Sequence, residues 1–242
     1  SAGYVIRSMV GGIDSFPFLA VPMFVLAGIL MAHGKISEKL FDVFVYFLGN
    51  KRAGIPCAVI ITCLFYGAIS GSAPATVAAV GSMTIPLLIE LGYEKDFSTA
   101  IVAVAGGLGV IIPPSIPFIM YAMATGESVS DLFLAGIVPG MMISALLIFY
   151  AYYYCRRHGE DREKIQAKMD QLKTKGFVNI LKESIWALLS PVIVLGCIYS
   201  GVASPTEAAV ISVFYSLFVS LFIYKSIKVK QIWGIMVEAM KT

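Results

Sequence analysis

The sequence predicts an all-α protein that crosses a membrane several times. Hydrophobic residues make up 58% of the chain and charged residues 14%, against about 45–50% and 25% in soluble domains. The apolar residues fall in long runs, several of which reach the roughly 20 residues needed to span a hydrocarbon core. A soluble protein with a large core does not fit, because its apolar residues would recur at amphipathic spacing.

Residues 1–157 are expected to form a first membrane unit. It opens with an amphipathic interfacial segment, residues 3–15, followed by a span over residues 16–34. Residues 36–50 carry apolar side chains on one helical face and predict an arm helix that lies flat on the membrane, with Ser37 as its N-cap. A short connector of the kind found in soluble proteins is the alternative for this helix.

Residues 53–91 are apolar for nearly the whole stretch, but their middle is the polar run Ser70–Thr76. Either two full spans joined by a tight turn or a re-entrant hairpin would fit. Lys51 and Lys95 flank the stretch and place both ends on one side of the membrane in either case. We favour the hairpin, whose Gly/Ser/Pro tip would leave backbone groups that must face protein, water or an ion.

Residues 97–123 predict a broken helix. Gly106, Gly107 and Gly109 precede Pro113 and Pro114 near the middle of the run. One continuous helix cannot accommodate these glycines and adjacent prolines, so we expect two half-helices and an unwound joint.

The remaining segments continue the same pattern. They are a span over residues 131–155, a solvated cytoplasmic linker over 158–182, and the start of a second unit over 183–242 with spans at 184–203 and 206–225 and an amphipathic tail. Arg156, Arg157 and the Lys225–Lys230 cluster then fall on the same side as Lys51, which the positive-inside rule makes cytoplasmic.

Enzymatic, metal and nucleic-acid functions find no support in the residue pattern. The four cysteines lie in or beside apolar runs at no zinc spacing, and the two histidines have no partner at metal-ligand spacing. No Ser/His/Asp, Cys/His or paired-carboxylate arrangement is evident. Acidic residues lie at span ends rather than inside spans, apart from Glu207 near the start of the last span. Helix capping is the favoured explanation for Glu207, and a role in the transport site is the alternative.

The tip and the joint are the best candidates for a binding site. Discontinuous helices are where transporters hold ions and substrates. Unwound carbonyls and Ser/Thr hydroxyls, with no carboxylate among them, suit a monovalent cation such as Na⁺. Small residues also serve close helix packing in membranes, but packing does not require adjacent prolines in mid-span.

Four phrases in order identify a family resemblance. The runs GAISGSAPATVAAVGSMTIPLL and GGLGVIIPPSIPFIMYA, with DLFLAGIVPG and SPTEAA, resemble the large membrane subunit of TRAP transporters, the DctM-type permease. The resemblance covers nearly the whole chain. It implies an elevator-type ion-transporter fold with a re-entrant hairpin, a discontinuous helix and inverted repeats, located in the bacterial inner membrane.

The resemblance also implies roles for particular residues. The expected Na⁺ site uses Ser70, Gly71, Ser72, Gly106, Gly109 and Pro113, and the expected substrate site uses Ser72, Thr76, Pro114, Ser115, Thr206 and Glu207. No cofactor is expected beyond Na⁺ as the coupling ion.

The implied function is Na⁺-coupled transport of an organic acid, such as a C4-dicarboxylate or sialic acid. The implied partners are a small membrane subunit, a periplasmic substrate-binding protein and the lipid bilayer. The alternative is another Na⁺- or H⁺-coupled transporter of the same fold that needs no binding protein. The second inverted repeat is expected to be truncated, with its own hairpin and broken helix after Thr242.

Overall fold

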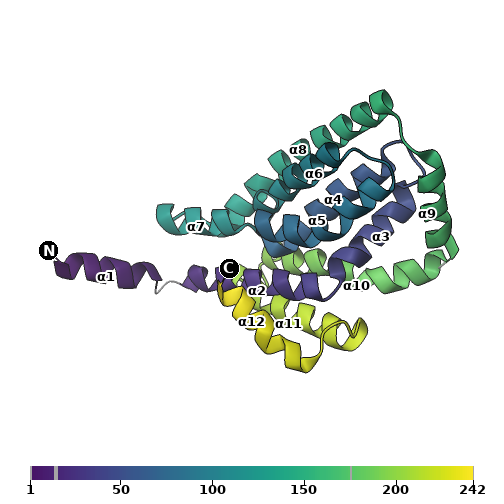
Figure 1. Cartoon of the computed structure of the whole chain (residues 1–242). Helices are drawn as coiled ribbons and strands as arrows, with labels where there is room; N and C mark the ends of the chain where they lie inside the picture. The colour runs from purple at the N-terminus through teal and green to yellow at the C-terminus, as the bar shows by residue number, and fades with distance from the viewer. Residues whose placement is uncertain (1, 14–15, 175, 242) are drawn as a thin grey trace.

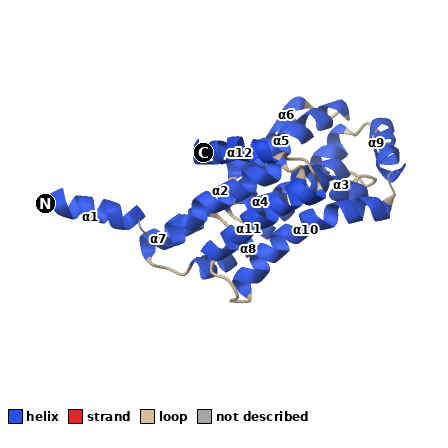
Figure 2. Ribbon diagram, turned by 90° about the horizontal axis from the view of Figure 1, so that it is seen from below, coloured by secondary structure: helices blue, strands red, loops and turns tan. Residues whose placement is uncertain are grey.

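The computed structural model describes residues 2–13, 16–174 and 176–241, and every regular element in those residues is a helix (Figure 2). The helices are α1 (Ala2–Ile13), α2 (Ala20–His33), α3 (Ile36–Leu48), α4 (Gly54–Ser70), α5 (Ala73–Glu90), α6 (Lys95–Gly106), α7 (Ile116–Thr125), α8 (Val129–His158), α9 (Arg162–Thr174), α10 (Phe177–Tyr199), α11 (Pro205–Phe218) and α12 (Val229–Lys241). Short segments are η1 (Phe16–Leu19), η2 (Gly107–Val110) and the π-helical η3 (Val219–Ile223). Four helices of the described chain are long and apolar enough to cross a membrane, or five if one bent pair counts as a span, which confirms a polytopic membrane protein.

The bent pair is α2 and α3, which meet at 65° across Gly34 and Lys35. Lys35 takes a left-handed backbone conformation and α3 begins at Ile36, so the prediction that Ser37 caps this helix is wrong. The apolar face of α3 also packs on protein. Leu40 and Phe41 are buried, and the helix lies against α4 and α10.

Helices α4, α5 and α6 form a packed group with α8 behind them (Figure 1). The chain reverses between α4 and α5 over two residues only, Gly71 and Ser72. It breaks again after α6, where η2 and the irregular residues 111–115 precede α7. Apolar side chains from these helices and from α3 form the main core.

The linker prediction needs correction. Residues 162–174 form α9, and Ile165, Met169 and Leu172 are buried on one of its faces against α3. A Cβ on Gly49 would lie 2.3 Å from the Met169 sulfur, so α9 approaches the end of α3 closely. The segment is therefore a docked amphipathic helix, and α10 already begins at Phe177, inside the predicted linker; residue 175 lies outside the described residues.

The C-terminal helices pack around α2. Helix α11 lies along α2 and α10, and α12 returns across α2 with Ile235 buried (Figure 1). At the other end of the chain, α1 projects from the body with Tyr4, Val5 and Ile6 exposed. This helix occupies the predicted interfacial segment, whose last residue, Ser15, lies outside the described residues.

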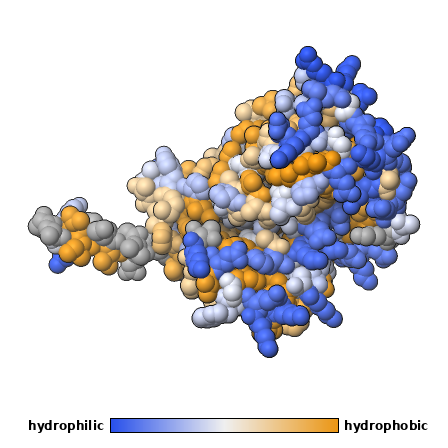
Figure 3. Space-filling view, in the orientation of Figure 1, coloured by the Kyte–Doolittle hydropathy of each residue, from blue (hydrophilic) through white to orange (hydrophobic). Residues whose placement is uncertain are grey.

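Hydrophilic side chains gather over α9 and the adjoining helix ends, and others cover the lower part of this face, with apolar areas between them (Figure 3). Arg156 and Arg157 lie in the last turn of α8, immediately before this polar region. That this end of the molecule faces the cytoplasm stays a prediction of the positive-inside rule.

Candidate functional site

The tip of the α4–α5 hairpin is a tight two-residue turn. Gly71 ends α4 in the left-handed region, with φ of 63°, and its N–H donates to the carbonyl oxygen of Gly67. Ser72 is extended, and Pro74 lies in the first turn of α5, where its missing N–H costs no helical hydrogen bond. The irregular part is therefore shorter than the predicted run Ser70–Thr76, because Ala73 to Thr76 are helical.

Three residues of the tip share a closed circuit of hydrogen bonds. The Thr76 hydroxyl donates to the Ser72 carbonyl oxygen at 2.8 Å, so its oxygen accepts from the Ser70 hydroxyl at 3.0 Å. The Ser70 oxygen in turn faces the Ser72 N–H at 3.4 Å. Ser70 and Thr76 are 1% and 0% exposed, so these hydroxyls depend on each other rather than on bulk water.

The joint after α6 is organised by Ser115. Its hydroxyl donates to the Val110 carbonyl oxygen at 2.7 Å and accepts from the Phe118 N–H at 3.3 Å, which caps α7. The side chain is fully buried. The peptide bond between Pro113 and Pro114 is cis, and both prolines are buried.

The tip and the joint touch each other directly. The Ile116 N–H donates to the Gly71 carbonyl oxygen at 3.3 Å. A Cβ on Gly71 would lie 2.8 Å from the Pro114 oxygen, and one on Gly109 would lie 2.7 Å from the Thr76 hydroxyl. These positions require glycine because a side chain would separate the two segments.

Two further glycines extend the contact along the helices. A Cβ on Gly67 would lie 2.5 Å from the Cα of Gly109, which is backbone against backbone. One on Gly106 would lie 2.2 Å from a methyl carbon of Val77. Helix α4 therefore meets η2 backbone to backbone, and α5 packs against the end of α6 through the Val77 side chain.

Helix α2 contacts the tip from another side. The buried Tyr66 hydroxyl donates to the Gly28 carbonyl oxygen at 2.7 Å, and a Cβ on Gly28 would lie 2.9 Å from that of Ser70. Gly28 and Tyr66 are not among the residues predicted for the site. Their partners are 42 and 38 residues away in the chain, and no local pattern marks such a pair.

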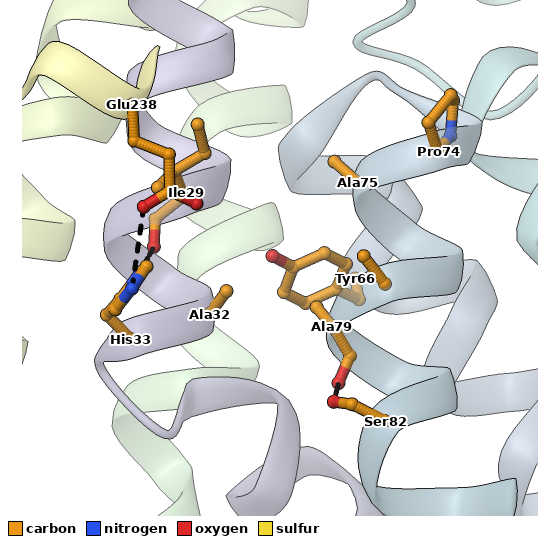
Figure 4. A pocket seen from close by; sticks show the side chains of 10 residues that line it. Ile29, Ala32, His33, Tyr66, Pro74, Ala75, Ala79, Ser82 and Glu238 are labelled. Carbon is orange, nitrogen blue, oxygen red and sulfur yellow. Dashed lines mark hydrogen bonds and ion pairs between the residues drawn. The ribbon is translucent and has the colours of Figure 1, made fainter. Parts of the chain in front are cut away.

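A cavity of about 410 Å³ opens between α2 and the hairpin (Figure 4). Ala32 and His33 line it from α2, Tyr66 from α4, and Pro74 from the start of α5. The His33 ring lies 3.6 Å from the Glu238 carboxylate of α12 at its far wall. The walls are otherwise mostly apolar and end beside the tip.

The electrostatics of the tip and joint are those of neutral oxygens. The acceptors in the hydrogen bonds described for this contact are hydroxyl and carbonyl oxygens, and none is a carboxylate. No group of three or more His, Cys, Asp or Glu side chains suited to a metal occurs within residues 2–13, 16–174 and 176–241. Such a donor set suits a monovalent cation better than a divalent or transition metal.

The structure brings most of the predicted site residues together. Those that lie in the tip, in the joint or at the close contact between them are Ser70, Gly71, Ser72, Thr76, Gly106, Gly109, Pro113, Pro114 and Ser115. Thr206 instead lines a separate cavity of about 330 Å³, formed with residues of α2, α7 and the α7–α8 turn.

Glu207 has a structural task in this arrangement. Its carboxylate accepts from the Ser204 N–H at 2.7 Å while its own N–H donates to the Ser204 hydroxyl at 3.3 Å, which completes a capping box at the start of α11. The capping role that the sequence allowed is present. A substrate role for Thr206 or Glu207 stays a prediction.

Comparison with known proteins gives consistent matches over the whole chain. Residues 2–242 match the family described as "Tripartite ATP-independent periplasmic transporter, DctM component". The isethionate TRAP transporter permease protein DctMQ of Oleidesulfovibrio alaskensis is 44% identical over 239 residues, covering 99% of this chain and 37% of the relative.

Other relatives show similar identity. The C4-dicarboxylate TRAP transporter large permease protein DctM of Pseudomonas aeruginosa is 38% identical over 228 residues, or 94% of this chain and 52% of the relative. The sialic acid TRAP transporter permease protein SiaT of Haemophilus influenzae is 35% identical over 234 residues, or 97% and 37%. The chain thus spans about a third to a half of the length of the curated relatives it matches.

Proposed function

This chain belongs to the DctM family of tripartite ATP-independent periplasmic transporters, and we propose that it forms part of a large permease subunit that carries an organic acid together with Na⁺. The observation that carries the proposal is the direct contact between the hairpin tip and the broken-helix joint. Both are irregular in backbone, buried, and furnished with neutral oxygens.

Na⁺ is the proposed coupling ion because of these oxygens. In the circuit of Ser70, Ser72 and Thr76 each hydroxyl oxygen keeps acceptor capacity after its hydrogen bonds are counted. Residues 111–114 of the facing segment lie outside any helix and supply further carbonyl oxygens. A cation bound between the two segments would hold the tip against the joint, and this ordering would couple the ion to the substrate site.

An organic anion is the proposed substrate because two helices begin at this contact. Helix α5 starts after Ser72 and α7 starts after Ser115, so both helix N-termini lie where the tip meets the joint. The first N–H groups of a helix attract anions, and broken helices in transporters use them in this way. The names of the relatives include C4-dicarboxylate, sialic acid and isethionate, all of them organic acids.

The remaining proposals concern the whole transporter. The hairpin-bearing group α4–α6 is proposed to move as an elevator against the helices around α2, in a bacterial inner membrane. A small membrane subunit and a periplasmic binding protein are the proposed partners, since the family is a component of a tripartite periplasmic system.

Uptake by the full transporter in proteoliposomes tests the proposal. Labelled C4-dicarboxylate, sialic acid and isethionate would be offered with and without a Na⁺ gradient, and with and without the binding protein. We expect uptake of one acid only when both are present, and loss of Na⁺-driven uptake in the double variant Ser70→Ala/Thr76→Val, which removes both hydroxyls of the circuit. Uptake driven by a proton gradient would overturn the proposed Na⁺ coupling. Uptake independent of the binding protein would overturn that proposed partner.

A further inference from the structure

The base of the α4–α5 hairpin contains a buried carboxylate outside the proposed transport site. Glu160 lies in the short loop between α8 and α9, and its side chain is only 2% exposed. Acidic side chains are rarely buried to this extent unless they are paired or hydrogen-bonded. The hydrogen-bond partners of this carboxylate therefore indicate which segments of the chain it connects.

One oxygen of Glu160 receives hydrogen bonds from both ends of the hairpin. The N–H of Ala53, immediately before α4, donates to Oε1 at 3.0 Å. The hydroxyl of Tyr93, just after α5, donates to the same atom at 2.7 Å. The residue before α4 and a residue shortly after α5 thus meet on a single atom.

The second oxygen connects the carboxylate to α9. The guanidinium of Arg162 donates to Glu160 Oε2 at 3.0 Å and to the Asn50 carbonyl oxygen at 3.3 Å. Arg162 is about half exposed, so this ion pair lies at the edge of the buried group. The end of α3 is thereby included in the same network.

The backbone takes a positive φ at both ends of the hairpin, next to Glu160. Ala53 has φ of 56°, a left-handed conformation that residues with a Cβ rarely adopt. Gly92, with φ of 91°, would place a Cβ 3.2 Å from that of Asp161, the residue after Glu160. Only glycine permits this approach of the α5 exit to the loop without strain.

The hydrogen bond from Tyr93 persists at every physiological pH. Burial, followed by the hydrogen bond to Glu160, raises the pKa of Tyr93 well above its usual value. The phenol therefore stays protonated and keeps donating to the carboxylate.

We propose that Glu160 is a positioning residue that braces the base of the hairpin, so that α4 and α5 cannot separate and the tip is presented to the joint at a fixed distance. At the tip the two helices are joined covalently, whereas at the base Glu160 joins them. If the base opens, α4 and α5 shift against each other and the close glycine contacts at the tip are lost. The effect on ion binding rests on the proposed function, whereas the brace itself does not.

The test compares three variants of the full transporter. Glu160→Ala removes the acceptor, and Tyr93→Phe removes one donor while its ring keeps the neighbouring Phe97 at 6.2 Å between centroids. Tyr154→Phe is the matched control, because its hydroxyl also bonds a carboxylate, Glu94 at 2.5 Å, but not the one that joins the hairpin ends.

Hydrogen–deuterium exchange reports the brace without reference to Na⁺. We expect Glu160→Ala and, less strongly, Tyr93→Phe to accelerate exchange at both hairpin ends and at the unaltered tip, residues 67–76. The control should leave the tip unchanged. Equal tip exchange in all folded variants, or equal acceleration in the control, would overturn the brace.

The Na⁺ dependence of uptake gives the second readout. Loss of a charge-assisted hydrogen bond predicts that Glu160→Ala raises the half-saturating Na⁺ concentration by about tenfold. A purely structural role would lower the amount of folded transporter and leave that concentration unchanged, which would contradict the positioning role. Uptake by the unaltered transporter that ignores Na⁺ would refute the proposed function instead, and the exchange data would still decide on the brace.

Discussion

At its tip the α4–α5 hairpin is held by neutral hydroxyls and by backbone contacts at glycines, whereas at its base it is held by a buried carboxylate with an arginine beside it. The tip lies in the predicted transport site and the base lies next to the polar surface around α9. Under the proposed function, we expect the contact at the tip to be reversible and the contact at the base to persist. Neutral oxygens can exchange partners with an ion at low cost, but a buried charge cannot lose its partners cheaply.

The largest effect is expected where the tip meets the joint through backbone alone. Gly67→Ala would put a methyl group 2.5 Å from the Cα of Gly109. Although alanine favours a helix interior, we expect a net destabilisation of about 2–3 kcal/mol from overpacking. Thermal unfolding of the purified full permease, together with uptake, measures it.

Gly107→Ala is the matched control for that substitution. Gly107 lies in the same joint, but a Cβ there would meet nothing within 4 Å. Its stability and uptake should stay near those of the unaltered chain. If both alanine variants behave alike, the close contact between tip and joint is not what holds this end of the hairpin.

The next effect concerns the hydroxyl circuit. Thr76→Val keeps the shape of the side chain but removes the hydroxyl that faces Ser70, and we expect a loss of about 1–2 kcal/mol with weaker Na⁺ dependence of uptake. Thr84→Val is the control on the same helix, since Thr84 is equally buried and bonds only the carbonyl oxygen four residues back, at 2.7 Å. If both variants shift the Na⁺ dependence of uptake equally, the hydroxyl circuit has no specific role in ion binding.

A smaller effect is expected between the tip and α2. Tyr66→Phe removes the hydrogen bond to the Gly28 carbonyl oxygen and should cost about 1 kcal/mol. If α4 moves against α2 during transport, the maximal uptake rate should change while the half-saturating Na⁺ concentration does not. Tyr215→Phe, which loses a bond between α11 and α10 instead, provides the comparison.

The smallest effect concerns acid sensitivity beside the base. Hydrogen bonds from the backbone and side chain of Lys164 lower the pKa of Asp161 below its ordinary value of 3.8. The stabilisation is therefore complete above pH 3.8 and is lost as the pH falls through the lowered pKa. Exchange at the start of α9 should rise only in that acid window, and Asp161→Asn should remove the rise. A rise already near neutral pH would contradict this assignment.

The sequence predicted the helical membrane class and the positions of both irregular segments. Glycine and proline disfavour a continuous helix whatever the tertiary structure. The sequence alone therefore indicates a break at Gly71, at the glycines of η2 and at the adjacent prolines. The irregular tip is shorter than the predicted run Ser70–Thr76, because the first turn of a helix accepts Pro74.

Other features depend on contacts distant in the chain. Glu160 acquires its role from Ala53 and Tyr93, which are 107 and 67 residues away. The docking of α9 left a trace, because Ile165, Met169 and Leu172 recur at helical spacing, but the surrounding charges suggested a solvated linker. The hydrogen bond between Tyr66 and Gly28 has no corresponding local pattern in the sequence.

Equilibrium binding of radioactive sodium to the purified full permease, without transport, tests the central claim most directly. The unaltered chain and the double variant Ser70→Ala/Thr76→Val would be compared. Loss of two oxygen ligands predicts a dissociation constant raised by at least about tenfold. An unchanged dissociation constant, with the protein still folded, would show that the tip and the joint do not form the sodium site.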